Sequence, residues 1–278
     1  MLGGEQSRLR GAASLCNRTG LKLLALATTL ALAGCGDSRF PDYRYKMTVL
    51  VATAEGQKAY SSVREVHQEE TSSIQDSSGR MVKASLRGEA VILDLPDGRT
   101  AYALLDRPES PEYASHIAEA ALLPMVRKPV RDERSDDLKS KPTEYLDRQA
   151  AEQQAMVKTV GPRDLPTERT VNSLGVRLPQ PVTLWPMFVT FGDPRDPKTI
   201  REVSPESLGV QRITIEITDD PVSQGIEKRL PWLPDYYSRQ FSGDRYQSLE
   251  NKSKGISAFM ASGAFSTGNG LNDHKGRH

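Results

Sequence analysis

Two stretches in which apolar and polar residues alternate constrain the fold of this 278-residue chain more than any other feature. In residues 211–218, with the sequence QRITIEIT, isoleucine recurs at every second position. In residues 43–52 four apolar side chains share one face in the same way: Tyr45, Met47, Val49 and Val51. Successive side chains of a β-strand point to opposite faces of a sheet, so this period predicts two half-buried strands.

Turn residues between apolar runs predict two β-hairpins. Gly56 supplies a turn after the first alternating stretch, and residues 59–66 are expected to pair back. An Asp-Gly pair separates the apolar runs 89–95 and 100–105. Glycine readily adopts the positive φ of tight turns, and Asp-Gly between apolar runs is among the clearer hairpin signals.

Capping residues and helical spacing predict three helices. Ser110-Pro111-Glu112 has the form of an N-cap, a proline in the first turn and an early acid, and the helix that follows is expected to stop at Pro124. Residues 143–160 carry a thin apolar stripe that predicts a second helix. A short third helix is expected within residues 226–232.

The remaining segments are assigned from composition. Residues 182–191 are rich in aromatic and β-branched side chains and predict a strand, with Pro186 at an edge or a bulge. The polar residues 71–80 are expected to form a loop. From about Ser242 the chain is rich in Ser, Gly, Asn and Lys, which predicts a loosely held tail.

These elements define an α+β fold: a mostly antiparallel sheet with a few helices on one side, a signal peptide at the N-terminus and a poorly ordered C-terminal tail. The expected parts are a lipoprotein signal peptide (1–34), a tether (35–42), a β-hairpin and helix region (43–124), a charged helical insertion or linker (125–181), a second sheet-forming segment (182–241) and a flexible tail (242–278). Whether residues 125–181 separate two domains or decorate one stays open.

The N-terminus has the pattern of an export signal. Residues 1–22 carry four basic side chains against one acid, and an apolar run of about a dozen residues follows from Leu23 to Gly34. A helix needs about 20 apolar residues to cross the hydrocarbon core of a membrane. The run therefore predicts the apolar region of a signal peptide and is too short for a comfortable membrane span.

The apolar run ends in Leu32-Ala33-Gly34-Cys35, which resembles the lipobox of bacterial lipoproteins. The resemblance implies cleavage before Cys35, a diacylglyceryl group on its sulfur and a further acyl chain, such as palmitate, on the new amino terminus. A thiol is the most nucleophilic side chain in this region, and several acyl chains together anchor a protein stably. The alternatives are a plain secretory signal with a fortuitous cysteine and a buried helix of a soluble protein.

The same resemblance predicts the location. The expected site is the cell envelope, with the protein anchored in a membrane and facing the periplasm. Gly36 follows the cysteine, and in the enteric sorting rule this residue favours the outer membrane over the inner one. Asp37, one position later, leaves the inner membrane as the alternative.

The body of the chain resembles a family of uncharacterised proteobacterial proteins. The segments that carry the resemblance are the opening strand with its Gly56 turn, the hairpin at 88–105, PMFVTF at 186–191, DPKT at 196–199, IEITDDPV at 215–222 and GIEKRLPWL at 225–233. The resemblance implies one coherent fold. That family has no assigned activity, so no catalytic or binding residue is transferred.

Composition excludes several kinds of chemistry. Cys16 would leave with the leader and lipid would occupy Cys35, so no disulfide, cysteine-ligated metal or thiol nucleophile is expected. The net charge is +1 for the chain and −2 once the leader, with four basic residues and one acid, is removed. Basic and acidic residues are interspersed, so nucleic acid is not an expected partner. No cofactor is expected either.

Titratable residues outside the leader receive ordinary structural interpretations as surface groups, turn formers or caps: His67, His116, Asp193, Asp196, Asp219 and Asp220. No catalytic or phosphate-binding motif is present in the sequence, and no metal site is expected.

One candidate contact surface remains. Lys228, Arg229 and Trp232 combine cations with an aromatic residue, as interface hot spots do. The expected function is a non-enzymatic accessory or binding component of the envelope, which contacts the membrane through Cys35 and another envelope protein through this surface. The alternatives are a periplasm-facing hydrolase that uses Asp219 or Asp220, and a carrier of an apolar ligand.

Overall fold

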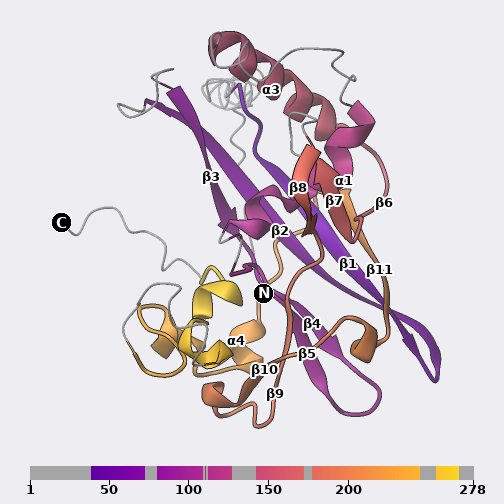
Figure 1. Cartoon of the computed structure of the whole chain (residues 1–278), viewed down its shortest axis with the longest axis vertical. Coiled ribbons are helices and arrows are strands. Elements are labelled where there is room, and N and C mark those ends of the chain that lie inside the picture. The colour runs from indigo at the N-terminus through magenta and orange to yellow at the C-terminus, as the bar shows by residue number, and fades with distance from the viewer. Residues whose placement is uncertain are drawn as a thin grey trace, which may run out of the picture. The chain divides into compact units, whose positions relative to one another are not determined.

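Strand β1 (Tyr43–Thr53) lies at the centre of the largest sheet (Figure 1). It pairs on one side with β2 (Gly56–Ser72) and on the other with β11 (Val210–Ile217), and both pairings are antiparallel. Strand β3 (Arg80–Arg87) extends the sheet beyond β2, and β6 (Arg163–Asp164) extends it beyond β11. The first predicted hairpin and the strand of alternating isoleucines are confirmed.

The computed structural model describes residues 39–72, 80–108, 110, 112–126, 142–171, 177–244 and 255–268. All of them belong to one unit, residues 39–278. The predicted signal peptide, Cys35 and the first residues of the predicted tether lie outside the described residues.

The predicted alternation places one face of the large sheet against the core. Its fully buried side chains from the central strand are Tyr45, Met47, Val49 and Val51. Across the β1–β11 ladder, Ile215 lies opposite Met47 and Ile213 lies opposite Val49, and both isoleucines are fully buried. Because side chains directly opposite each other on one face touch, these pairs fix the register of the two strands.

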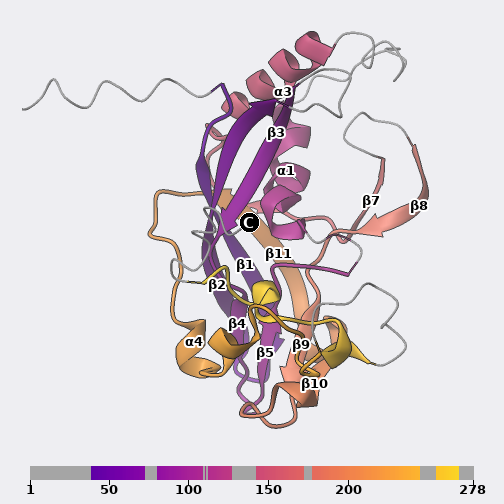
Figure 2. The same ribbon diagram turned by 90° about the vertical axis from the view of Figure 1, so that its left-hand side faces the viewer.

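Two helices lie on this buried face of the large sheet (Figure 2). Helix α1 (Tyr113–Val126) contacts β3, β6 and β11, and α3 (Pro142–Met156) packs on α1. The hydroxyl of Tyr45 donates to the carbonyl of Ala114 at 2.6 Å and ties the central strand to the first turn of α1. The predicted mostly antiparallel sheet with helices is confirmed, and this arrangement is consistent with an α+β or a mainly β fold.

The helix ends differ from the predicted ones. Helix α1 continues through Pro124, because a proline in the last turn removes only one helical hydrogen bond. Helix α3 ends at Met156, four residues before the predicted end, where the N–H of Thr159 donates to the Met156 carbonyl in a turn.

A second antiparallel sheet has the order β10-β9-β5-β4. Its strands are β4 (Val91–Asp94), β5 (Thr100–Ala103), β9 (Phe188–Phe191) and β10 (Ile200–Glu202). The β4–β5 pairing confirms the second predicted hairpin.

The single strand predicted over residues 182–191 is wrong. Residues up to Thr183 belong to β8 (Arg177–Thr183), which pairs with β7 (Glu168–Val171) in a separate two-stranded sheet, whereas β9 belongs to the second sheet. The chain changes sheets at Pro186, which has no N–H to offer a ladder.

The predicted loop over residues 71–80 is only partly confirmed. Strand β2 runs to Ser72 and β3 begins at Arg80, so strand covers both ends of the predicted loop. Residues 73–79 lie outside the described part of the chain. Strand β3 was not predicted, although Val82, Ala84 and Leu86 alternate with polar residues.

Short helices complete the described elements. They are α4 (Ile226–Arg229) and the 3₁₀ helices η1 (Pro197–Thr199), η2 (Glu206–Leu208), η3 (Leu233–Tyr236), η5 (Ile256–Ala258) and η6 (Ser262–Ala264). Helix α4 agrees with the short helix predicted within residues 226–232.

An aromatic cluster forms a second core beside the smaller sheet. Its rings come from distant parts of the chain: Tyr102, Phe191, Trp232, Phe241 and Phe265. Neighbouring ring centroids in this cluster lie 5.0 to 5.8 Å apart, within the range of favourable aromatic pairs.

The tail prediction is wrong for residues 255–268. Phe265 is fully buried in the aromatic cluster, and Met260 and Ala264 are buried beside it. The prediction rested on the Ser, Gly, Asn and Lys content of residues 242–278 as a whole, but the apolar residues within 255–268 anchor this segment. Residues 245–254 and 269–278 of the predicted tail lie outside the described residues.

Replacing Phe265 with alanine is expected to lower the free energy of unfolding by about 3–5 kcal/mol, because it opens a cavity among packed rings. Val160→Ala serves as the control, since that side chain is 83% exposed and should change stability by less than about 0.5 kcal/mol. Urea denaturation measures both. A Phe265→Ala loss as small as that of the control would contradict the packing of this segment.

Candidate functional site

A polar cavity of about 440 Å³ lies where three segments of the chain meet. Arg87, Gly88 and Glu89 come from the end of β3 and the residues after it. Residues 222–227 lead into α4 and begin it, and residues 266–268 follow η6. A volume of this size is within the range of small-molecule sites.

Hydrogen bonds hold the three walls of the cavity together. The backbone N–H of Gly88 donates to the Thr267 hydroxyl at 3.1 Å, and the N–H of Thr267 donates to the Gly88 carbonyl at 3.1 Å. The N–H of Ser223 donates to the Val63 carbonyl at 3.0 Å, and the Ser223 hydroxyl accepts from the Val63 N–H at 2.9 Å. The cavity is therefore formed by fixed backbone.

Glu89 forms the buried floor of the cavity. Its carboxylate accepts a hydrogen bond from the backbone N–H of Ile226 at 2.8 Å. Burial raises the pKa of this carboxyl above its usual range, whereas the N–H groups of Ile226 and Gly225 lower it. The Glu89 carbonyl accepts hydrogen bonds from the Ser62 hydroxyl at 2.8 Å and from Arg64 Nε at 3.2 Å.

Arg64 lies behind this floor and is fully buried. Its Nη1 approaches the Tyr45 hydroxyl at 3.5 Å and the Met47 sulfur at 3.6 Å, and its guanidinium lies 5.9 Å from the centre of the Tyr45 ring. Within the described residues, its Nη2 has no hydrogen-bonding partner. A buried charge is costly unless opposite charges lie near it, and Glu89 and Asp106 both interact with Arg64 electrostatically.

Asp106 is the most strongly perturbed carboxyl of this region. Burial raises its pKa to about 7, the positive charge of Arg64 lowers it, and Glu112 raises it. Sequence reasoning did not group Asp106, Glu89 and Arg64, because these residues come from three separate segments. Strand β2, which carries Arg64, is largely polar along its whole length, so Arg64 does not stand out in the sequence.

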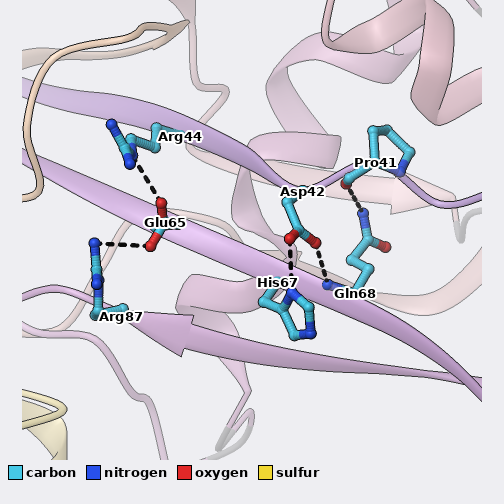
Figure 3. A network of polar contacts seen from close by, with 7 residues as sticks. All are labelled: Pro41, Asp42, Arg44, Glu65, His67, Gln68 and Arg87. Carbon is cyan, nitrogen blue, oxygen red and sulfur yellow. Dashed lines mark hydrogen bonds and ion pairs between the residues drawn. The ribbon is translucent and has the colours of Figure 1, made fainter. Parts of the chain in front are cut away.

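Arg44, Glu65 and Arg87 form a network of ion pairs on the large sheet (Figure 3). Arg87 also lines the cavity. Glu65 accepts from Arg44 Nε at 2.8 Å and from Arg87 Nη2 at 2.9 Å. Two guanidinium groups therefore share one carboxylate, and the trio has a net charge of +1.

The structure separates the three residues of the predicted contact surface. Trp232 is only 9% exposed, its indole N–H donates to the Pro194 carbonyl at 2.8 Å, and it packs edge-on against Phe241. The indole is thus part of the aromatic core and offers no exposed hot spot. Lys228 and Arg229 are exposed, and Arg229 forms an ion pair with Asp94.

The two histidines of the folded body are surface groups. His67 Nδ1 lies 2.7 Å from Asp42 Oδ2, as Figure 3 shows. His116 lies near Glu119 and Glu112, and these carboxylates raise its pKa. Among the residues that the structure describes, no group of three His, Cys, Asp or Glu side chains could hold a metal ion.

Asp193, Asp196 and Asp220 make local structural contacts. Asp193 accepts from the N–H of Arg195 and Asp196 from the N–H of Lys198, both at 2.9 Å, so both aspartates stabilise turns. Asp220 lies 3.0 Å from Lys46 Nζ, which lowers the aspartate pKa and keeps it ionised. A low pKa does not suit a general acid at neutral pH.

A second cavity of about 400 Å³ lies between α1 and β8. Arg107 and Arg169 contribute cationic groups, and Ile117 and Val182 contribute apolar surface. Arg107 already donates to the Trp185 carbonyl at 2.5 Å. Its lining includes none of the predicted contact residues Lys228, Arg229 and Trp232. It also lacks the buried charged residues Arg64, Glu89 and Asp106.

Comparisons with known proteins identify no relative: no family model, no curated protein and no solved structure matches the chain. The two resemblances described from the sequence stay predictions. In the described part of the chain, no helix has the length and apolar character to cross a membrane.

Gly88→Ala is expected to destabilise the fold more than Gly56→Ala does. Both glycines have a positive φ, +148° and +111°, but a Cβ on Gly88 would lie 3.0 Å from Arg64 Cγ whereas one on Gly56 meets no atom within 4 Å. Overpacking costs about 1–3 kcal/mol in addition to the backbone strain. Equal urea midpoints for the two variants would show that Arg64 does not press on the cavity wall.

Asp106→Asn is expected to gain stability relative to the unmodified chain as pH rises from 4.5 to 8. The folded chain holds a proton on Asp106 up to about pH 7, whereas an unfolded aspartate releases it near 3.8. Ionisation therefore destabilises the fold as pH rises through this window, and asparagine cannot ionise. The gain should be on the order of 3 kcal/mol in urea denaturation, because each unit of pKa difference corresponds to about 1.4 kcal/mol. If the difference in free energy of unfolding between Asp106→Asn and the unmodified chain does not change with pH, the raised pKa of Asp106 is contradicted.

Proposed function

We propose that the chain is an exported lipoprotein, anchored in a cell-envelope membrane by lipid on Cys35, and that its body is a non-enzymatic accessory or binding component facing the periplasm. The observation that carries this proposal is the sequence Leu32-Ala33-Gly34-Cys35 at the end of a short apolar run. Gly36 favours the outer membrane as the destination.

The start of the folded body supports a lipid anchor close to its surface. Four residue steps separate Cys35 from Arg39, and an extended chain covers at most about 14 Å over that length. Phe40 is already fully buried and packs with Leu146 and Ala150 of α3. Under this proposal, the end of the body that holds Phe40 and α3 lies next to the membrane.

The polar cavity supports a binding role for the body. Its floor and walls are held by backbone hydrogen bonds, so the site is preorganised. Of the two acids named for the hydrolase alternative, Asp220 is paired with Lys46 and Asp219 is exposed. The polar lining around Glu89 also suits a polar ligand better than the apolar ligand of the carrier alternative.

Metabolic labelling with a palmitate analogue tests the anchor. The unmodified chain should incorporate label, fractionate with membranes, and give a mature mass that begins at Cys35 with its acyl chains. Cys35→Ala should abolish labelling, because no other side chain at the cleavage site can accept the diacylglyceryl group.

Cys16→Ala is the matched control, since it removes the other cysteine of the chain without touching the predicted cleavage site. Its labelling should equal that of the unmodified chain. A soluble, unlabelled product cleaved at another position would show a plain secretory signal and overturn the lipoprotein proposal.

A further inference from the structure

The cavity beside Glu89 has charges of opposite sign from different segments. Arg87 contributes a guanidinium from the end of β3, and Glu227 contributes a carboxylate from α4. Arg87 is exposed, Glu227 is partly buried, and Glu89 lies buried at the floor. The site thus combines an accessible cationic group with an acidic floor and wall.

The positive charge of Arg87 is only partly neutralised by its ion pair with Glu65. Glu65 is shared between Arg44 and Arg87, so this trio keeps a net positive charge on the rim. A guanidinium has five N–H donors in a planar fork that matches a carboxylate. Arg87 uses a donor on Nη2 to reach Glu65, and its fork can therefore also serve a bound anion.

The acidic side has two carboxylates that influence each other. The negative charge of Glu227 adds to burial in raising the pKa of Glu89. Glu227 accepts one long hydrogen bond, 3.3 Å, from the Tyr237 hydroxyl, and a carboxylate has lone pairs for several donors. A ligand ammonium group would offset the repulsion between the two acids.

Ser223 contributes a hydroxyl to the lining of the same cavity. The Ser223 oxygen accepts from the Val63 N–H at 2.9 Å, which leaves its hydroxyl proton to donate to a ligand carbonyl. The volume of about 440 Å³ holds a molecule larger than a single small amino acid, together with a few waters.

We propose that this cavity binds a small zwitterion of about dipeptide size, with its carboxylate at Arg87 and its ammonium group at Glu227. The inference rests on the binding role proposed above and gives it a ligand class. It does not depend on the lipid anchor, so a failure of palmitate labelling and a failure of ligand binding are separate results.

Isothermal titration calorimetry of the full chain in detergent tests the proposal with three probes. They are L-alanyl-L-alanine, its N-acetyl derivative, which lacks the ammonium group, and its C-terminal amide, which lacks the carboxylate. The free dipeptide should bind saturably, and each derivative should bind about tenfold more weakly, because each loses one charge-assisted contact.

Two variants assign the ends of the ligand. Glu227→Gln should remove the preference for the dipeptide over its N-acetyl derivative and keep the preference over the amide, and Arg87→Gln should do the reverse. The control variants Glu55→Gln and Arg99→Gln change the same charges at turns away from the cavity and should keep both preferences.

The outcomes that overturn the proposal are definite. On the unmodified chain, they are the absence of saturable dipeptide binding up to about 10 mM and equal affinity for all three probes. In Arg87→Gln and Glu227→Gln, the contradicting result is an equal loss of affinity for all three probes. The comparison of probes on the unmodified chain needs no variant, so it decides the question even if Arg87→Gln fails to fold.

Discussion

The pairing of β1 with strands on both of its sides is the interaction on which the rest of the structure depends. Strand β2 follows β1 directly in sequence, whereas β11 lies more than 150 residues later, and the two ladders place them on either side of one strand. The same face of β1 then carries the apolar residues against which α1 packs. A change that shifted the β1–β11 register by one residue would turn the buried isoleucines of β11 toward solvent.

The sequence predicted the parts of the fold that depend on local patterns. Alternation located β1 and β11, turn residues located both hairpins, and the N-cap before Tyr113 located α1. The split at Pro186 was missed because β-propensity is equally high on both sides of it, and only tertiary packing assigns the two halves to different sheets. Residues 255–268 were missed because polar sequence flanks them on both sides, and a phenylalanine such as Phe265 does not reveal from the sequence which rings surround it.

The candidate site could not have been predicted from the sequence, for a different reason. Arg64, Glu89 and Glu227 belong to separate segments and form no motif at a fixed spacing. Trp232 illustrates the opposite error, since its charged neighbours Lys228 and Arg229 suggested a surface while tertiary packing buries the ring. Charged residues in a short helix such as α4 do not show whether their sequence neighbours are exposed. Lys228 and Arg229 face solvent, whereas Leu230 and Trp232, which follow directly, are buried.

The wall formed by Thr267 has a consequence for the order of assembly. Its partner Gly88 lies 179 residues earlier, so the cavity closes only when nearly the whole chain is available to fold. Contacts of such long range form slowly, after the loop between them has been closed. Under the proposed export of the chain, and if it crosses the membrane unfolded, the site would be absent throughout translocation and would form only after the chain has crossed.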